Sequence, residues 1–135
     1  MSVPLHEALE ALRAAEKAQA VHYRRLAVLA EAAGDEATAE RLHDLHADEQ
    51  HHLSRLTARL VELGHTPREL SGGSGGERTL EGWEAVAREL ETAEVTRYER
   101  MLAEDADPAT RSLLEGILEV ERHHRAELAG KWTVA

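Results

Sequence analysis

One pattern constrains this chain more than any other: an apolar stripe, stepping by three and four residues, recurs in four long segments. Such steps are typical of one face of an amphipathic α-helix. The chain contains no Phe, and aromatic residues make up 3% of it, a composition that suits helices better than sheets. We therefore predict an all-α fold of four helices.

Residues that start and stop helices set the expected boundaries. Pro4, Asp35, Thr79 and the pair Asp107-Pro108 favour helix starts, whereas glycines such as Gly34 favour helix ends. The four helices are expected at about residues 4–33, 35–63, 79–104 and 108–130.

The connections between these segments predict how the helices pair. The first and third connections are very short, so each should join two antiparallel neighbours. The middle link, about residues 64–78, contains the run SGGSGG at 71–76 and is flexible by composition. About 14 extended residues reach up to roughly 45 Å, whereas a helix of about 25 residues is roughly 37 Å long. We predict two antiparallel hairpins joined by a long crossover, with a simple up-down-up-down bundle as the alternative.

Composition limits the class of protein. A chain of 135 residues is expected to form one domain, residues 1–135. With no Cys, disulfides, thiolate metal sites and thiol catalysis are excluded. The net charge of −10 argues against nucleic-acid partners, and no apolar run is long enough for a membrane span. We expect a cytoplasmic protein without nucleic-acid or membrane partners.

Each apolar stripe carries a glutamate near its middle. The four residues lie at similar distances from their helix starts, so they could share one level of a bundle: Glu16, Glu49, Glu94 and Glu121. A buried carboxylate costs several kcal/mol unless it is paired, protonated or bound to metal. Two divalent cations would remove the repulsion among four such groups. The alternative is that these glutamates interrupt imperfect stripes and face solvent.

Histidines complete the predicted ligand set. The motif Glu-x-x-His is weak evidence alone, because it also occurs off the apolar stripes, as at Glu40. Two copies do fall on stripes, and they add His52 after Glu49 and His124 after Glu121. Four carboxylates and two imidazoles are the donor set of a di-iron or di-manganese carboxylate site.

In this pattern the chain resembles the rubrerythrin-like di-iron proteins of the ferritin-like superfamily. The resemblance implies a ferritin-like four-helix bundle in which Glu49 and Glu121 bridge two metals. Glu16 and His52 would complete one metal, and Glu94 and His124 the other.

The resemblance also implies roles for residues around the metals. Glu91 would be an additional metal ligand on the third helix. Tyr23 and Tyr98 would lie beside the ligands, and Asp48 would accept a hydrogen bond from His124. Because the chain lacks the Cys-rich rubredoxin domain that rubrerythrins commonly carry, electrons would come from an external donor.

The function expected from the resemblance is a di-iron oxidoreductase, either a peroxidase or a ferroxidase, that reacts Fe(II) with peroxide or O₂. A di-iron oxygenase (hydroxylase) of a small organic substrate, a non-catalytic iron-handling protein and a purely structural bundle remain alternatives. Manganese could replace the two iron ions. We expect a homodimer.

Overall fold

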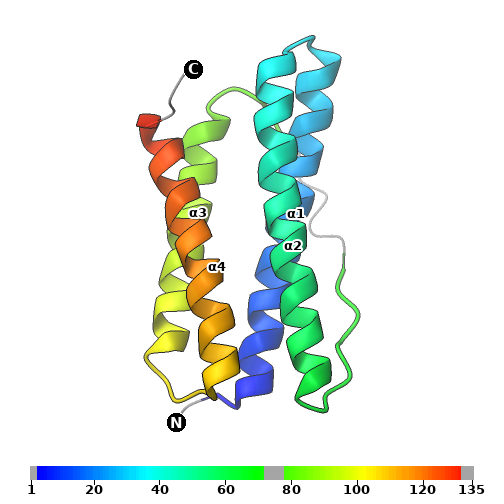
Figure 1. Ribbon diagram of the computed structural model, residues 1–135. Coiled ribbons are helices and arrows are strands. Elements are labelled where there is room, and N and C mark those ends of the chain that lie inside the picture. Colours follow the sequence, from blue (N-terminus) through cyan, green and yellow to red (C-terminus); the bar gives the residue numbers. More distant parts are fainter. Residues whose placement is uncertain (1–2, 72–77, 132–135) are drawn as a thin grey trace. The chain divides into compact units, whose positions relative to one another are not determined.

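The computed structural model describes residues 3–71 and 78–131. They form four α-helices, α1 (Leu5–Ala32), α2 (Glu36–Glu62), α3 (Trp83–Leu102) and α4 (Pro108–Ala126), followed by a π-helical turn, η1 (Glu127–Lys131). Figure 1 shows their order along the chain. No strand occurs in the part of the chain that the structure describes, which confirms the predicted all-α class.

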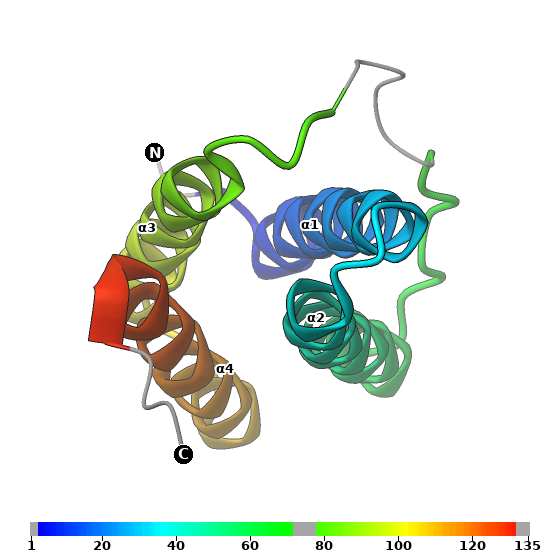
Figure 2. The ribbon, with the colours of Figure 1, turned by 90° about the horizontal axis from the view of Figure 1, so that it is seen from above.

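The helices belong to two compact units. The first unit spans His6–Glu81 and contains α1 and α2, which we call the α1/α2 hairpin. The second unit contains α3, α4 and η1, which we call the α3/α4 hairpin. Within each hairpin the two helices lie side by side in both Figure 1 and Figure 2. The predicted single domain over residues 1–135 stays a prediction.

The turn between α1 and α2 combines a glycine that ends α1 with an aspartate that caps the start of α2. Gly34 adopts φ 75°, a left-handed conformation that a residue with Cβ rarely adopts, and Asp35 N donates to Ala30 O over 2.9 Å. The Asp35 carboxylate then accepts from Thr38 N at 3.1 Å. Hydrogen bonds from the Thr38 side chain and backbone lower the pKa of Asp35 below its usual 3.8. The turn predicted at Gly34-Asp35 is therefore made by local chemistry.

Polar contacts fasten α1 to α2 along their length. Arg13 Nε donates to Thr57 Oγ1 over 2.9 Å. Farther along, His46 Nδ1 lies 2.8 Å from Ala20 O. The apolar core of this hairpin follows the predicted stripes and includes Leu9, Leu12, Tyr23, Leu26, Leu42, Leu45, Leu56 and Leu60.

Residues 65–71 return along the α1/α2 hairpin and are held to α1. Arg68 N donates to Glu10 Oε2 over 2.9 Å, and Arg13 Nη1 donates to Arg68 O over 3.3 Å. Arg13 also pairs with Glu10, and both side chains are buried. We call residues 65–71 the return segment. Residues 72–77, most of the predicted Ser/Gly-rich crossover, lie outside the described residues.

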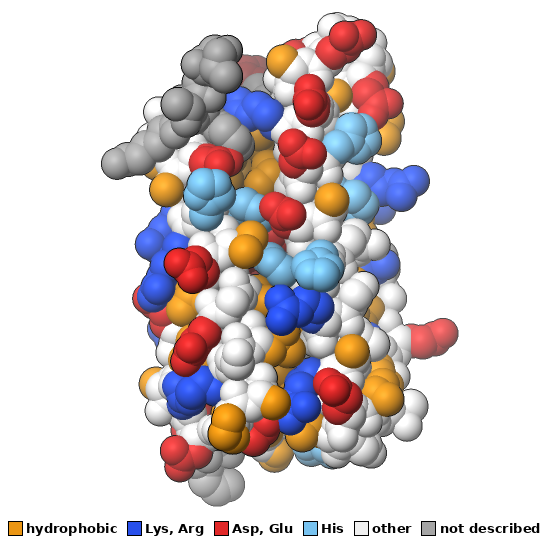
Figure 3. All heavy atoms as spheres, viewed as in Figure 1, with side chains coloured by type: hydrophobic (Ala, Val, Ile, Leu, Met, Phe, Trp, Pro, Cys, Tyr) orange, Lys and Arg blue, Asp and Glu red, His pale blue; other side chains and the backbone are white. Residues whose placement is uncertain are grey.

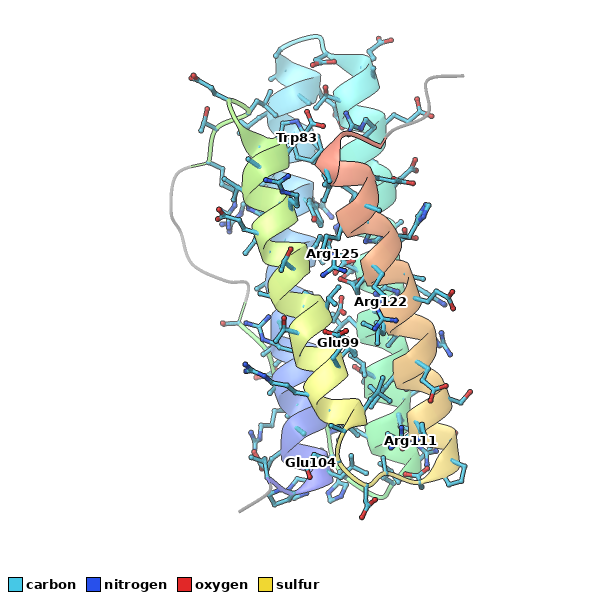
Figure 4. The ribbon with its side chains drawn as sticks, turned by 90° about the vertical axis from the view of Figure 1, so that its left-hand side faces the viewer. Trp83, Glu99, Glu104, Arg111, Arg122 and Arg125 are labelled. Atoms are coloured by element: carbon cyan, nitrogen blue, oxygen red, sulfur yellow. The ribbon has the colours of Figure 1, made fainter. Side chains whose placement is uncertain are left out.

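The α3/α4 hairpin is closed by a second capped turn. Asp107 accepts from Thr110 N at 3.0 Å, and Pro108 is the first residue of α4. Arg111 Nη2 donates to Leu102 O at 3.0 Å and Glu104 O at 3.1 Å, and Figure 4 shows Arg111 and Glu104 near this turn. Midway along the helices, Arg122 Nη2 donates to Glu99 Oε2 over 2.9 Å (Figure 4).

The third helix begins later than predicted. It starts at Trp83 rather than Thr79, because Gly82 adopts φ 70° and lies in the left-handed region. Thr79 does accept a hydrogen bond at Oγ1, from Glu81 N over 3.2 Å. That bond belongs to a local turn before the helix, so the cap predicted at Thr79 was wrong.

The surface carries a local excess of acid. Acidic side chains gather around the turn end of the α1/α2 hairpin (Figure 3), where an open pocket of about 400 Å³ is lined by Glu31, Glu36, Glu40, His43 and Asp44 among others. No helix within the described ranges is both long enough and apolar enough to cross a membrane.

Candidate metal centre

The α1/α2 hairpin gathers three predicted ligands. One ligand atom from each of Glu16, Glu49 and His52 lies within 4.8 Å of the others. His52 Nδ1 is 3.6 Å from Glu16 Oε2 and 3.9 Å from Glu49 Oε1. Glu16 and Glu49 are 0% exposed and His52 is 2% exposed. We call these residues the first cluster.

The α3/α4 hairpin gathers an equivalent set. Ligand atoms of Glu91, Glu121 and His124 also lie within 4.8 Å of one another. His124 Nδ1 is 3.5 Å from Glu91 Oε1 and 3.9 Å from Glu121 Oε1. All three side chains are buried. We call these residues the second cluster.

The two clusters belong to an internal repeat that the stripes alone did not reveal. In each hairpin one cluster glutamate on the first helix precedes a Glu-x-x-His motif on the second. At one constant offset, α2 and its cap align with α4, its cap and η1. Identical residues occur at Asp35 and Asp107, Ala37 and Ala109, Thr38 and Thr110, Leu42 and Leu114, Glu49 and Glu121, His51 and His123, His52 and His124, and Leu56 and Leu128. Aligning the two Asp-x-Ala-Thr caps would have exposed this repeat from sequence.

The repeat shows which residue of α3 corresponds to Glu16. Glu94 was predicted to complete the metal at His124, with Glu91 as an additional ligand, and the structure places Glu91 in the second cluster. Glu94 is 1% exposed, and its Oε1 accepts from Arg97 Nη1 over 2.6 Å. Glu94 corresponds to Gln19, since each lies three residues after the first glutamate of its cluster.

Glu91 and Glu94 both lie on the buried face of α3, because they are three residues apart, and the predicted stripe differs from that face at Leu90. The predicted stripe of the third helix passed through Leu90, which is 37% exposed, whereas Glu91 is 0% exposed. Both residues lie at an allowed step from the buried Ala87. Hydrophobicity predicted that Leu90 would lie on the buried face, but in the folded helix Glu91 lies there.

The residues predicted to surround the ligands are found in different environments. Tyr23 and Tyr98 are both 0% exposed, and each lies seven residues after the first glutamate of its cluster. Asp48 is exposed, and its predicted hydrogen bond with His124 stays a prediction. His22, beside Tyr23, was not singled out as a site residue. Burial and the nearby Arg78 lower its pKa, and its Nδ1 accepts from Arg78 Nε over 3.0 Å.

The donor set of each cluster fits a divalent transition metal. Two carboxylates and one imidazole converge in a buried site, and iron, manganese and zinc accept such ligands. Two buried anionic carboxylates so close together repel each other strongly. A cation of charge two offsets them, and the neutral imidazole supplies a third donor.

Comparison with known proteins supports the fold. A model of the ferritin-like domain matches residues 2–69. The crystal structure of a conserved hypothetical protein from Mycobacterium tuberculosis is similar, with a TM-score of 0.75 and 14% sequence identity over 96% of this chain and 92% of that one. No curated protein matches. The predicted ferritin-like fold class is confirmed.

Proposed function

Since the chain belongs to the ferritin-like family, we propose that it is a di-iron oxidoreductase that reacts Fe(II) with peroxide or O₂. One observation carries the proposal: both hairpins contain a buried cluster of two glutamates and one histidine with the same order along the chain. In this proposal each cluster supplies the ligands of one iron ion.

The protein's own residues have three tasks in this proposal. Glu16, Glu49, Glu91 and Glu121 neutralise the bound ions and can bind through one or two oxygens, so they can follow a change in metal charge. His52 and His124 supply neutral nitrogen donors. Iron supplies the reversible change between Fe(II) and Fe(III).

Burial of the clusters supports redox chemistry over simple surface binding. The four cluster glutamates are 0% exposed, so bulk water has little access to their oxygens. Tyr23 and Tyr98, also 0% exposed, contribute bulk and a phenolic O–H on the helices that provide Glu16 and Glu91. Burial of this kind favours small reactants such as peroxide and O₂ over larger organic substrates.

The test is anaerobic loading with Fe(II), followed by metal analysis and rapid mixing with H₂O₂ or O₂. We expect two irons per chain and faster oxidation by peroxide than by O₂. Glu49→Ala and Glu121→Ala should each lower the iron bound. The matched control is Glu40→Ala, which alters a Glu-x-x-His motif whose Glu40 and His43 are exposed.

The possible results separate the proposed function from its alternatives. Faster reaction with O₂ and growth of a mineral core would favour iron handling. Fewer than one metal per chain after loading, with the Glu49 and Glu121 variants no different from the Glu40 control, would refute the site.

A further inference from the structure

A second pocket lies on the α1/α2 hairpin and takes no part in the proposed metal chemistry. Its volume is about 530 Å³, and it is open to solvent. Residues of α1, α2 and the return segment line it: Arg13, Lys17, Leu53, Ser54, Thr57, Ala58 and Leu70. None of these lining residues is acidic.

Arg13 forms a fixed cationic wall of this pocket. It is 6% exposed, and Thr57, Glu10 and the Arg68 carbonyl hold its Nε and Nη1 atoms. Nη2 makes no hydrogen bond with the other described residues, so its two N–H groups are available to a ligand. A guanidinium held this way loses little side-chain entropy when it binds a carboxylate.

Lys17 supplies the net positive charge. Glu10 offsets the charge of Arg13, whereas Lys17 has no hydrogen bond or ion pair with the other described residues. Lys17 lies about one turn after Arg13 on α1 and is half-buried. The pocket therefore carries an uncompensated cation on a protein whose overall charge is −10.

The remaining lining residues divide into polar and apolar groups. Ser54 contributes a hydroxyl group, whereas the Thr57 hydroxyl already bonds with Leu53 O and Arg13 Nε. Leu53, Ala58 and Leu70 contribute an apolar wall. Leu70 belongs to the return segment, so the bonds that fasten Arg68 to α1 also position this wall. A ligand that satisfies both groups has an anionic head and a short apolar body.

We propose that this pocket binds a small organic acid, with its carboxylate at Lys17 and Arg13 and its hydrocarbon part against Leu53, Ala58 and Leu70. Planar carboxylates suit paired guanidinium and ammonium donors, and the apolar wall favours an aliphatic or aromatic body over a bare inorganic anion. Binding at this pocket does not require metal, so it is independent of the proposed function.

Calorimetric titration of the full-length, metal-depleted protein tests the proposal, with octanoate, 1-octanol and inorganic phosphate as probes. We expect one octanoate per chain and at least about tenfold weaker binding of each other probe. Lys17→Gln should weaken octanoate binding about fivefold or more, and Leu70→Ala should weaken it as well.

Arg24→Gln is the matched control, because Arg24 is an exposed cation on the same helix and does not line the pocket. It should bind octanoate as the unaltered protein does, and circular dichroism should show both charge variants folded. The proposal is overturned if octanoate does not bind, if octanol or phosphate binds as tightly, or if Lys17→Gln behaves like Arg24→Gln.

Discussion

Arg97 Nη1 lies 2.6 Å from Oε1 of Glu94, a carboxylate that is 1% exposed. Arg97→Gln removes this cation and leaves the buried charge of Glu94 less compensated. We expect the metal-free protein to lose about 1–2 kcal/mol of unfolding free energy in urea. The estimate is modest because the Arg97 side chain is itself 50% exposed.

Arg122→Gln is the control for that measurement. Arg122 and Glu99 are each 50% exposed, so their ion pair should contribute only about 0–1 kcal/mol. Equal losses for the two variants would show that burial of Glu94 adds nothing to its pairing with Arg97.

Replacing a cluster glutamate by glutamine should have opposite effects on the metal-free and metal-loaded protein. Glu121→Gln removes one buried negative charge beside Glu91, so the midpoint of thermal unfolding without metal should rise by at least about 3 °C. The same variant should lose the stabilisation that iron gives the unaltered protein, about 2.7 kcal/mol at a hundredfold excess over Kd. Differential scanning calorimetry with and without Fe(II) measures both effects.

The exposed Glu40 again serves as the reference for this pair of measurements. Glu40→Gln should leave both midpoints unchanged. A Glu121→Gln protein that is destabilised without metal, yet still stabilised by iron, would contradict the role given to Glu121.

The Asp35 cap should make part of the stability depend on pH. The pKa of Asp35 is lowered in the folded protein by its hydrogen bonds with Thr38. Its contribution is therefore present above the unfolded pKa and is lost as the pH falls through the folded value. The stability difference between the unaltered protein and Asp35→Ala should stay constant near neutral pH and shrink as the pH falls below the usual aspartate pKa of 3.8.

Asp35→Asn separates charge from capping, because asparagine still accepts a hydrogen bond from Thr38 N but does not titrate in acid. Urea unfolding at several pH values should show that this variant lacks the pH-dependent contribution of Asp35. If the unfolding free energy of Asp35→Asn depends on pH in acid as strongly as that of the unaltered protein, the pH dependence belongs to other groups.

Loss of the Glu10 carboxylate should release the return segment. Glu10 accepts from Arg68 N and pairs with Arg13. Burial alone raises the pKa of Glu10, but hydrogen bonds from the Arg68 backbone and the Arg13 side chain lower it below its usual 4.5. Glu10→Ala should therefore speed cleavage after Leu70 by chymotrypsin, followed by mass spectrometry.

Glu7→Ala is the comparison for this experiment. Glu7 pairs with Arg68 only through exposed side chains, so its loss should change the cleavage rate little. Equal acceleration in both variants would show that the exposed pair, rather than Glu10, holds the segment.

Local sequence predicted the starts of α2 and α4 well, whereas α4 ends at Ala126 rather than near residue 130. Asp35 and Asp107 cap these helices and Pro108 begins α4, because a cap depends on a few adjacent residues. The first cluster was equally accessible, since Glu16, Glu49 and His52 lie on regular stripes.

Other features depend on contacts that no short stretch of sequence encodes. The predicted stripe of α3 passed through Leu90 because hydrophobicity alone does not show that its neighbour Glu91 lies on the buried face. The bonds from Arg68 to Glu10 and Arg13 join residues 58 and 55 positions apart. The pocket at Lys17 depends on these bonds, so it was missed as well.

Because of the internal repeat, an experiment at a position in one hairpin can be repeated at the equivalent position in the other. A substitution at Leu42 has its counterpart at Leu114, and both side chains are 0% exposed. Gln19 and Glu94 occupy equivalent positions in the two hairpins, so the chain itself contains both an amide and a carboxylate at this position. Each hairpin therefore supplies a reference state for the other, within one molecule and under identical solution conditions.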